Sequence, residues 1–286
     1  MGFDISRTIS KSIPVTFRKV KFGFSEKNTS KYWHNNSPFV SFFWSAMSTA
    51  FPEGELFFMD TGRYFKDEIN NPELKATVEE FIRQEAHHTY QHKRLNNMMV
   101  EHGFDMHKYE NWFGMWLRGV RKVLPKKLQL SVSMALEHFT ANFAHQYLAN
   151  PKYTEGVDTE VKALWSWHAA EEVEHKGVLY DLYYEVGGGY FGRVVTLAPA
   201  WTMLIALTLL AQAEMLAKDG KLLNVGDNVK GLWYLVGPTG LVTAMLPEFF
   251  RYFKPGFHPW DVNDKELMDS WYRNNGEYIT NLKVVA

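Results

Sequence analysis

Two short segments, far apart in the sequence, contain the same pattern of metal-binding side chains, Glu-x-x-His. The first places Glu85 three residues before His88, and the second places Glu172 three residues before His175. Residues three apart lie on one face of an α-helix, about one turn from each other. Helical proteins that bind two metal ions in their core use this unit twice and add one Glu from each of two further helices. The repeat therefore predicts a dinuclear metal site.

Two more glutamates are expected to complete the ligand set. Glu137 lies on a helical stripe with Leu130 and Met134, and no Lys or Arg shares that stripe. A buried carboxylate without a partner is very costly, so a metal ion is its natural counter-ion. Another helical segment offers Glu55 or Glu53 for the same role, and the spacing alone does not decide between them.

His168 is a further candidate ligand. On a helical wheel, His168, Glu172 and His175 fall on one stripe. This helix would therefore present one carboxylate and two imidazoles to the core, which makes His168 the seventh ligand. Either Glu85 or Glu172 would bridge the two ions, and the sequence leaves that choice open.

Other residues are predicted to lie around the ligands. His92 shares the stripe of the second ligand-bearing helix, and Glu171 lies close to the stripe of the fourth. Glu174 falls on a different side of that helix and is expected to point away. Arg63 and Tyr64 lie two turns beyond the first ligand and are candidates for hydrogen bonds that orient it. A surface salt bridge is the alternative for these two residues.

The composition limits the chemistry of such a site. The chain has 286 residues and no cysteine, which excludes disulfides, zinc–thiolate sites, iron–sulfur clusters and a cysteine nucleophile. Its 11 histidines and 32 acidic residues leave nitrogen and oxygen donors, which suit iron, manganese or zinc. The net charge of −1 gives no electrostatic reason to expect a nucleic-acid partner.

The elements that position these residues are expected to be helices, because apolar residues recur at helical rather than strand-like spacing. The expected helices span residues 38–69 with a bend or restart at Pro52, 73–101, 112–123 within a connection, 128–149 and 159–187. Each of the four long helices carries one set of ligands. An irregular segment at 1–36 would precede them. The sequence thus predicts an all-α fold, with a four-helix bundle and one long crossover at residues 37–190.

The C-terminal part, residues 191–286, is expected to add apolar helices and a tail. Residues 194–213 and 231–247 contain no charged residue, and the first segment is long enough to cross a bilayer. Packing on the bundle or on a partner subunit, as in a homodimer, is favoured because Pro and Thr reduce the apolarity of the run. A membrane-embedded or interfacial hairpin is the alternative. Since the N-terminus lacks a signal peptide, a cytoplasmic protein is expected, membrane-associated in that alternative.

Four blocks of the sequence carry a family resemblance. They are FPEGE at 51–55, FIRQEAHH at 81–88, ALEHFT at 135–140 and WHAAEEVEH at 167–175. Together they resemble a bacterial family catalogued as predicted metal-dependent hydrolases, over roughly residues 15–260. This resemblance implies Glu55 rather than Glu53 as the first ligand.

The layout is also similar to that of the ferritin-like diiron proteins. The pattern His168-x-x-x-Glu172-x-x-His175 is similar to the fourth-helix motif of the diiron arylamine N-oxygenases, in which a third histidine joins the cluster. This resemblance implies that His168 is the additional ligand and that the site holds two iron ions.

The function expected from these features is that of a diiron enzyme. With an electron donor, it would activate dioxygen and oxidise an apolar or aromatic small molecule. Hydrolysis by a metal-bound water is the alternative, and it ranks second because a histidine-rich set of seven ligands leaves fewer open positions for a substrate. A non-enzymatic alternative is a metal-binding, membrane-associated scaffold.

Overall fold

The computed structural model describes residues 13–282 of the chain. The start of the predicted irregular segment 1–36 and the end of the tail therefore lie outside the described residues. Between residues 13 and 282, the secondary structure consists of helices and turns, apart from an isolated β-bridge between His34 and Val157. The predicted all-α fold is thus confirmed.

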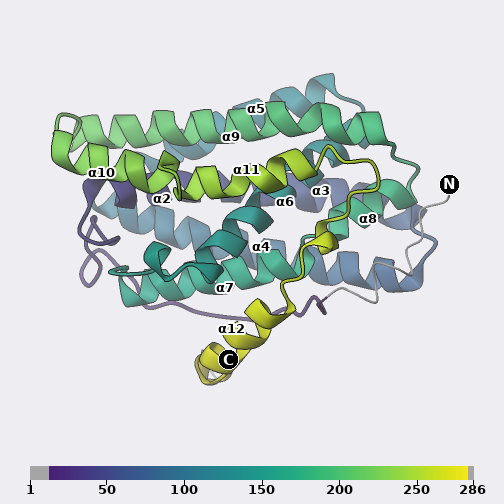
Figure 1. Ribbon diagram of the computed structural model, residues 1–286, viewed down its shortest axis with the longest axis horizontal. Helices are drawn as coiled ribbons and strands as arrows, with labels where there is room; N and C mark the ends of the chain where they lie inside the picture. Colours follow the sequence, from purple (N-terminus) through teal and green to yellow (C-terminus); the bar gives the residue numbers. More distant parts are fainter. Residues whose placement is uncertain (1–12, 283–286) are drawn as a thin grey trace.

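The helices follow one another along the chain with short connections (Figure 1). The α-helices are α2 (Pro38–Ser48), α3 (Phe51–Phe65), α4 (Pro72–Glu101), α5 (Met106–Val123), α6 (Lys126–Ala149), α7 (Thr159–His175), α8 (Val178–Glu185), α9 (Tyr190–Lys218), α10 (Val225–Val236), α11 (Leu241–Arg251) and α12 (Lys265–Leu282). Three short 3-10 helices lie at Lys66–Glu68, Pro151–Tyr153 and Pro259–Asp261.

Side-chain caps set the starting points of two ligand-bearing helices. The Asn71 side chain accepts hydrogen bonds from two backbone N–H groups at the start of α4, and Pro72 occupies the first helical position. The Asp158 carboxylate does the same at the start of α7. Such caps satisfy N–H groups that have no partner within the helix, and each contributes about 1 kcal/mol. Because each helix begins at a fixed residue, the face that carries its ligands is fixed too.

Four helices, α3, α4, α6 and α7, form the centre of the molecule and are called the central helices below. Helix α3 packs on α4, α6 packs on α7, and the two pairs meet through contacts of α3 with α6 and of α4 with α7. Helix α5 runs along the outside, where it contacts α3 and α9, and it connects the two pairs (Figure 1). The central helices therefore enclose a shared interior to which all four contribute side chains.

The helix boundaries agree with the expected break near Pro52 but differ from the expected ones further along the chain. The segment predicted at 38–69, with a bend or restart at Pro52, divides into α2 and α3 around Thr49 and Ala50, just before Pro52. The helix predicted to run to residue 187 is interrupted after His175, at Gly177. A Cβ atom at Gly177 would lie 2.6 Å from the indole nitrogen of Trp260, so the close packing of this ring leaves room only for glycine. Helix α7 thus ends with its last candidate ligand.

The apolar C-terminal helices cover one side of the central helices. Helix α9 packs on α2 and α6, α10 packs on α2, and α11 packs on α6 (Figure 1). Among the described residues, α9 alone is long and apolar enough to cross a membrane by length and composition, and 39% of its most apolar stretch is buried. The core helix of a soluble protein passes the same test, so this feature is weak evidence for a membrane span.

Candidate metal centre

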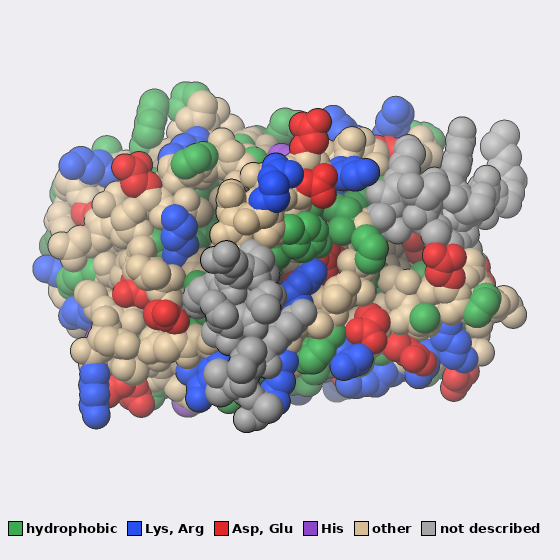
Figure 2. Space-filling model, turned by 90° about the horizontal axis from the view of Figure 1, so that it is seen from below, with side chains coloured by type: hydrophobic (Ala, Val, Ile, Leu, Met, Phe, Trp, Pro, Cys, Tyr) green, Lys and Arg blue, Asp and Glu red, His purple; other side chains and the backbone are tan. Residues whose placement is uncertain are grey.

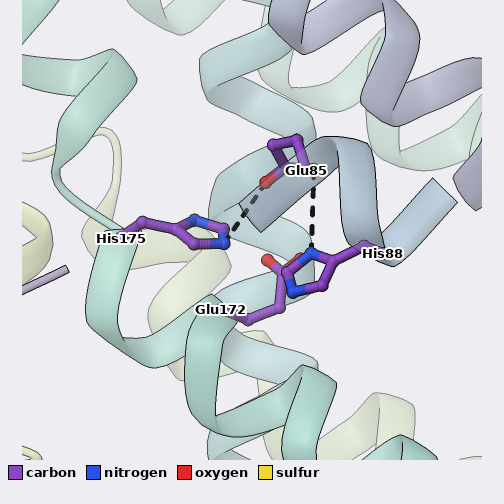
Figure 3. Close-up of side chains that lie close together, drawn as sticks. All are labelled: Glu85, His88, Glu172 and His175. Carbon is purple, nitrogen blue, oxygen red and sulfur yellow. Dashed lines mark ion pairs between the residues drawn. The ribbon is translucent and has the colours of Figure 1, made fainter. Parts of the chain in front are cut away.

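The two Glu-x-x-His pairs lie close together in the interior that the central helices enclose. One potential ligand atom from each of Glu85, His88, Glu172 and His175 lies within 4.8 Å of those of the other three, and all four side chains are buried. Figure 3 shows them pointing toward one another, with α4 on one side and α7 on the other. The helical spacing that the sequence suggested therefore does bring the pairs to one place.

The other three predicted ligands adjoin this group. Glu55 and His168 form a second group with His88, again with the ligand atoms within 4.8 Å of one another. The His175 imidazole connects Glu137 to the first group, because its Nδ1 lies 3.0 Å from Glu137 Oε2 and its Nε2 lies 3.2 Å from Glu85 Oε1. The structure thus places all seven predicted ligands in one buried cluster.

Several atoms of this cluster lack the hydrogen bonds that buried polar atoms normally make. They are Glu55 Oε1, both carboxylate oxygens of Glu85, Glu137 Oε1, His88 Nδ1 and His175 Nε2. A buried polar atom without a partner is destabilising, and native proteins contain few of them. Here they belong to neighbouring acidic and imidazole groups whose lone pairs suit a cation. The residues therefore fit divalent metal ions of the kind bound by nitrogen and oxygen donors.

The pKa values of the cluster also indicate a site that suits metal ions. Burial, reinforced by neighbouring carboxylates, holds the pKa of Glu55 and Glu85 well above the ordinary value. Burial also raises the pKa of Glu137 to about 7 against the opposing effect of His175. Burial alone would lower the pKa of His175, but Glu137 and Glu172 outweigh it and raise this pKa to about 9. Without metal, the cluster therefore retains protons, which metal binding would release.

A layer of polar groups behind the ligands orients the histidines. Glu171 Oε2 lies 3.1 Å from His88 Nε2, so the other ring nitrogen of His88 faces the cluster. The Trp167 indole N–H donates a hydrogen bond of 2.9 Å to Glu171. His92 plays the same part for His168, whose Nδ1 lies 2.6 Å from His92 Nε2. Glu171 and His92 thus contact two of the candidate ligands, and partners of this kind tune metal binding.

Two threonine hydroxyls, which the sequence analysis did not single out, hold ligand carboxylates. Thr89 donates a hydrogen bond of 2.8 Å to Glu55 Oε2, and Thr140 donates one to Glu172 Oε2. Thr89 follows Glu85 by four residues and Thr140 follows Glu137 by three, so each shares a stripe with a ligand of its own helix. That helical spacing was the signal that could have revealed them.

Arg18 is a further buried residue that sequence reasoning missed. Its guanidinium forms ion pairs with Glu171 at 3.1 Å and Glu174 at 2.6 Å. Glu174, which was expected to point away from the ligands, is thereby buried in this outer network, where Gln84 also donates to it at 3.0 Å. Arg18 belongs to an irregular segment distant in sequence from α7, so no helical periodicity could indicate the contact.

Arg63 and Tyr64 do not contribute to the centre, and this prediction was wrong. Both side chains are exposed, and the nearest acidic partner of Arg63 is Asp60, at 3.7 Å. Eight residues along a helix correspond to a shift of about 12 Å and a rotation of about 80°, so neither side chain can return to Glu55. The alternative of a surface salt bridge describes Arg63 correctly.

Two small cavities adjoin the cluster and share Phe51 and Thr140 among their lining residues. One, of about 20 Å³, reaches Glu55, and the other, of about 10 Å³, reaches His168 and Glu172. Each has room for roughly one water-sized molecule. The remaining lining is largely apolar: Met47, Ala50, Gly54, Phe58, Phe113, Leu136 and Leu204 in the first, and Phe143, Ala144, Tyr147, Trp165 and Ala169 in the second.

These features define the protein as an all-helical metal-binding protein with a buried Glu/His centre. A family model described as "Predicted metal-dependent hydrolase" matches residues 16–263. Because this match covers most of the chain, the protein belongs to the family of predicted metal-dependent hydrolases. No curated protein and no solved structure matches the chain. The family description supports metal dependence, and it favours the hydrolase alternative over the oxygenase that ranked first in the sequence analysis.

Proposed function

We propose that the protein is a hydrolase that uses two metal ions held by Glu55, Glu85, His88, Glu137, His168, Glu172 and His175. The observation that carries this proposal is the set of buried carboxylate and imidazole atoms without hydrogen-bond partners at one point of the interior. The family description supports hydrolysis as the reaction. Each central helix contributes at least one of these residues, and we therefore infer a ferritin-like four-helix bundle.

The metal ions, when bound, would lower the pKa of a bound water and polarise an ester or phosphate group. The protein's own residues hold the ligands for this task. Glu171 fixes the ring of His88, His92 fixes the ring of His168, and the hydroxyl of Thr140 fixes the carboxylate of Glu172. Because these partners are themselves buried, the ligands are held in place before a substrate arrives.

The Phe51 side chain occupies the space beside the proposed ligands and separates them from larger molecules. Its ring centroid lies 4.4 Å from that of His92 and 4.6 Å from that of His168, and it lines both small cavities. A substrate larger than these cavities can reach Glu55 or Glu172 only when side chains such as Phe51 move aside. The apolar lining would then exclude bulk water from the reacting group. We therefore expect a substrate whose apolar part is bound next to its ester or phosphate.

Oxidation by a diiron centre is the second candidate function, and two observations favour it. The cluster contains His168 as a third histidine, in keeping with the resemblance to the diiron arylamine N-oxygenases. The two cavities at the ligands are apolar and no larger than a small molecule such as dioxygen requires. This reaction would need an electron donor and an apolar or aromatic substrate.

Metal analysis followed by two activity assays separates these candidates. The purified protein should bind two ions of iron, manganese or zinc per chain after reconstitution. If hydrolysis is correct, the zinc or manganese form should cleave generic ester or phosphate substrates, and Glu137→Gln should abolish this activity. Oxygen consumption by the ferrous form, without hydrolysis by any form, would establish the second candidate instead.

Two negative results would count against both candidates. Failure to retain metal after reconstitution would remove the dinuclear centre on which they depend. Retention of metal without hydrolysis or oxygen consumption would favour the scaffold alternative. As a matched control, Glu79→Gln changes an exposed carboxylate on the same helix as Glu85 and should leave the metal content unchanged.

A further inference from the structure

Exposed apolar side chains are concentrated on the C-terminal helices. In the described part of the chain, 18 large hydrophobic residues are exposed, and 14 of them lie between residues 190 and 250. They are Tyr190, Phe191, Val195, Leu209, Leu210, Leu222, Leu223, Val225, Val229, Leu232, Trp233, Val236, Leu246 and Phe250. Single exposed apolar residues are normal on soluble proteins, but a large contiguous group marks an interaction surface.

These residues belong to one layer, called the outer apolar layer below, which consists of α9, α10, α11 and the loop at 219–224. Helix α9 packs on α2 and α6, α10 packs on α2, and α11 packs on α6 and contacts α10, so the faces of these helices that are turned away from α2 and α6 point outward (Figure 1). Exposed positions recur at helical spacing on α10, at Val225, Val229, Leu232 and Val236. Figure 2, which views the molecule from the side of α7 and α12, shows acidic and basic side chains interspersed instead.

The charges of the outer apolar layer are unbalanced in favour of cations. All four of its acidic residues are engaged within the protein: Glu214 pairs with Lys108, Asp219 with Lys31 and Glu248 with Arg251, while Asp227 accepts hydrogen bonds from Ser37 and Phe39. In contrast, the ammonium groups of Lys218, Lys221, Lys230 and nearby Lys254 make no ion pair or hydrogen bond to any residue that the structure describes. The free charge beside the apolar surface is therefore positive.

The loop between α9 and α10 combines both properties. Leu222, Leu223 and Val225 expose 48%, 87% and 70% of their surface. Lys221 directly precedes Leu222, and Lys218 lies three residues before Lys221. Trp233, on the following helix, is 66% exposed. Apolar side chains next to basic ones suit the boundary between lipid headgroups and acyl chains, where tryptophan is also enriched.

We propose that the outer apolar layer docks on the surface of a bilayer containing anionic lipids, with the 219–224 loop inserted among the headgroups. The layer lies on the bilayer and does not cross it, because the inner side of α9 is tied to the protein. The Trp201 indole donates to Ala135 O at 2.9 Å, and Gln212 donates to Phe39 O at 2.8 Å. Arg193 is buried at the start of this helix and donates to the Tyr180 hydroxyl at 2.7 Å.

A second copy of the chain is a less suitable occupant for this surface. A symmetric dimer through the layer would bring two sets of unpaired lysines together, and the layer has no free acidic residue to neutralise them. Like charges placed opposite each other oppose association, whereas anionic headgroups neutralise each lysine with a favourable interaction.

Vesicle flotation with the full-length protein tests this proposal. The protein should float with vesicles of phosphatidylcholine and phosphatidylglycerol, and at least tenfold less with phosphatidylcholine alone or at high salt, because the lysines supply part of the affinity. The double variant Leu222→Glu, Leu223→Glu should weaken binding to the mixed vesicles by tenfold or more. Lys218→Glu with Lys221→Glu should remove the preference for anionic lipid.

Tyr90→Glu is the matched control, because Tyr90 is 56% exposed on α4, away from the outer apolar layer. This variant should float like the unaltered protein. Equal flotation of the leucine double variant would overturn the proposal, as would the absence of flotation with any vesicle. Light scattering on the same samples identifies the rival occupant: a dimer that dissociates in the leucine double variant, without vesicle binding, would assign the surface to a second copy. All variants should show the unaltered circular dichroism spectrum, since the substituted positions are exposed.

Discussion

The central helices and the outer apolar layer both depart from the usual distribution of side chains. The central helices bury ionisable groups, whereas the outer apolar layer exposes apolar ones. The central helices bury four glutamates and three histidines at one point, and several of their atoms have no hydrogen-bond partner. The outer apolar layer exposes leucine, valine and tryptophan side chains to solvent. Most other residues follow the ordinary arrangement, with an aromatic-rich apolar core.

The comparison shows how a departure from that arrangement indicates a missing partner and its chemistry. Buried acidic and imidazole groups require cations, because charge without a counter-ion is costly in a medium of low dielectric constant. Exposed apolar groups require an apolar surface, because contact with water is unfavourable in proportion to their area. The two regions of this protein therefore fit partners of opposite kinds, and each prediction below separates the behaviour of one region from that of the other.

Removal of the metal should produce the largest change in stability. An ion present at a thousand times its Kd stabilises the folded state by about 4 kcal/mol, so two such ions contribute about 8 kcal/mol. Chelation should therefore lower the unfolding temperature substantially, and Glu85→Ala should be insensitive to chelation because its site is incomplete. Calorimetry with and without chelator measures this difference. Equal unfolding temperatures in the unaltered protein would contradict a metal-filled interior.

Arg18→Met should have the next largest effect. This change leaves the carboxylates of Glu171 and Glu174 buried beside each other without their cation, at a cost of about 4 kcal/mol. Because Glu171 holds the ring of His88, metal affinity should also fall by about 10- to 100-fold. Denaturant titration and competition with a chelating dye measure the two effects.

Arg83→Met provides the control for Arg18, since Arg83 makes an exposed ion pair with Glu80. Its effect on stability should be below about 1 kcal/mol, with no effect on metal affinity. A loss of stability in Arg18→Met without a change in metal affinity would show that the network supports the fold alone and does not orient His88.

The helices and the cluster of candidate ligands could be predicted from the sequence because both depend on local periodicity. The spacing of three residues in Glu85-x-x-His88 places both side chains on one face of a helix wherever that helix packs. The apolar neighbours of Glu137 indicated that its carboxylate is buried. The same periodicity defines the stripe of His168, which lies in the cluster in the structure.

The contacts that could not be predicted depend on the tertiary arrangement. Arg18 reaches Glu171 only because an irregular segment crosses α7, and nothing in its sequence specifies that path. The close packing of Trp260 against Gly177 likewise involves a distant segment. The sequence showed that residues 194–213 are apolar, but it could not show which side of α9 is covered, because apolar residues occur all around that helix.

Two leucines of α9 allow the comparison to be made within one helix. Leu204 is 4% exposed and packs toward the cavity beside Glu55, whereas Leu210 is 58% exposed on the outer apolar layer. Leu204→Ala should destabilise the protein by about 3 kcal/mol, because it leaves a cavity in the core. Leu210→Ala should change stability by less than about 0.5 kcal/mol, and urea titration measures both. A large loss in Leu210→Ala would mean that this side chain is covered in solution, for instance by a second copy.

Thr140→Val should have a smaller effect than Leu204→Ala, and this effect should be confined to the metal centre. Valine has nearly the shape of threonine but cannot donate the hydrogen bond to Glu172, and a hydrogen bond to a charged group contributes about 2 kcal/mol. If that hydrogen bond positions the carboxylate as a ligand, metal affinity should fall by more than tenfold. Thr61→Val is the control, because Thr61 is also buried on a central helix but bonds to Ser133, away from the ligands. It should lose stability without losing metal affinity, so equal affinity losses in both variants would show that the effect arises from general loosening of the core.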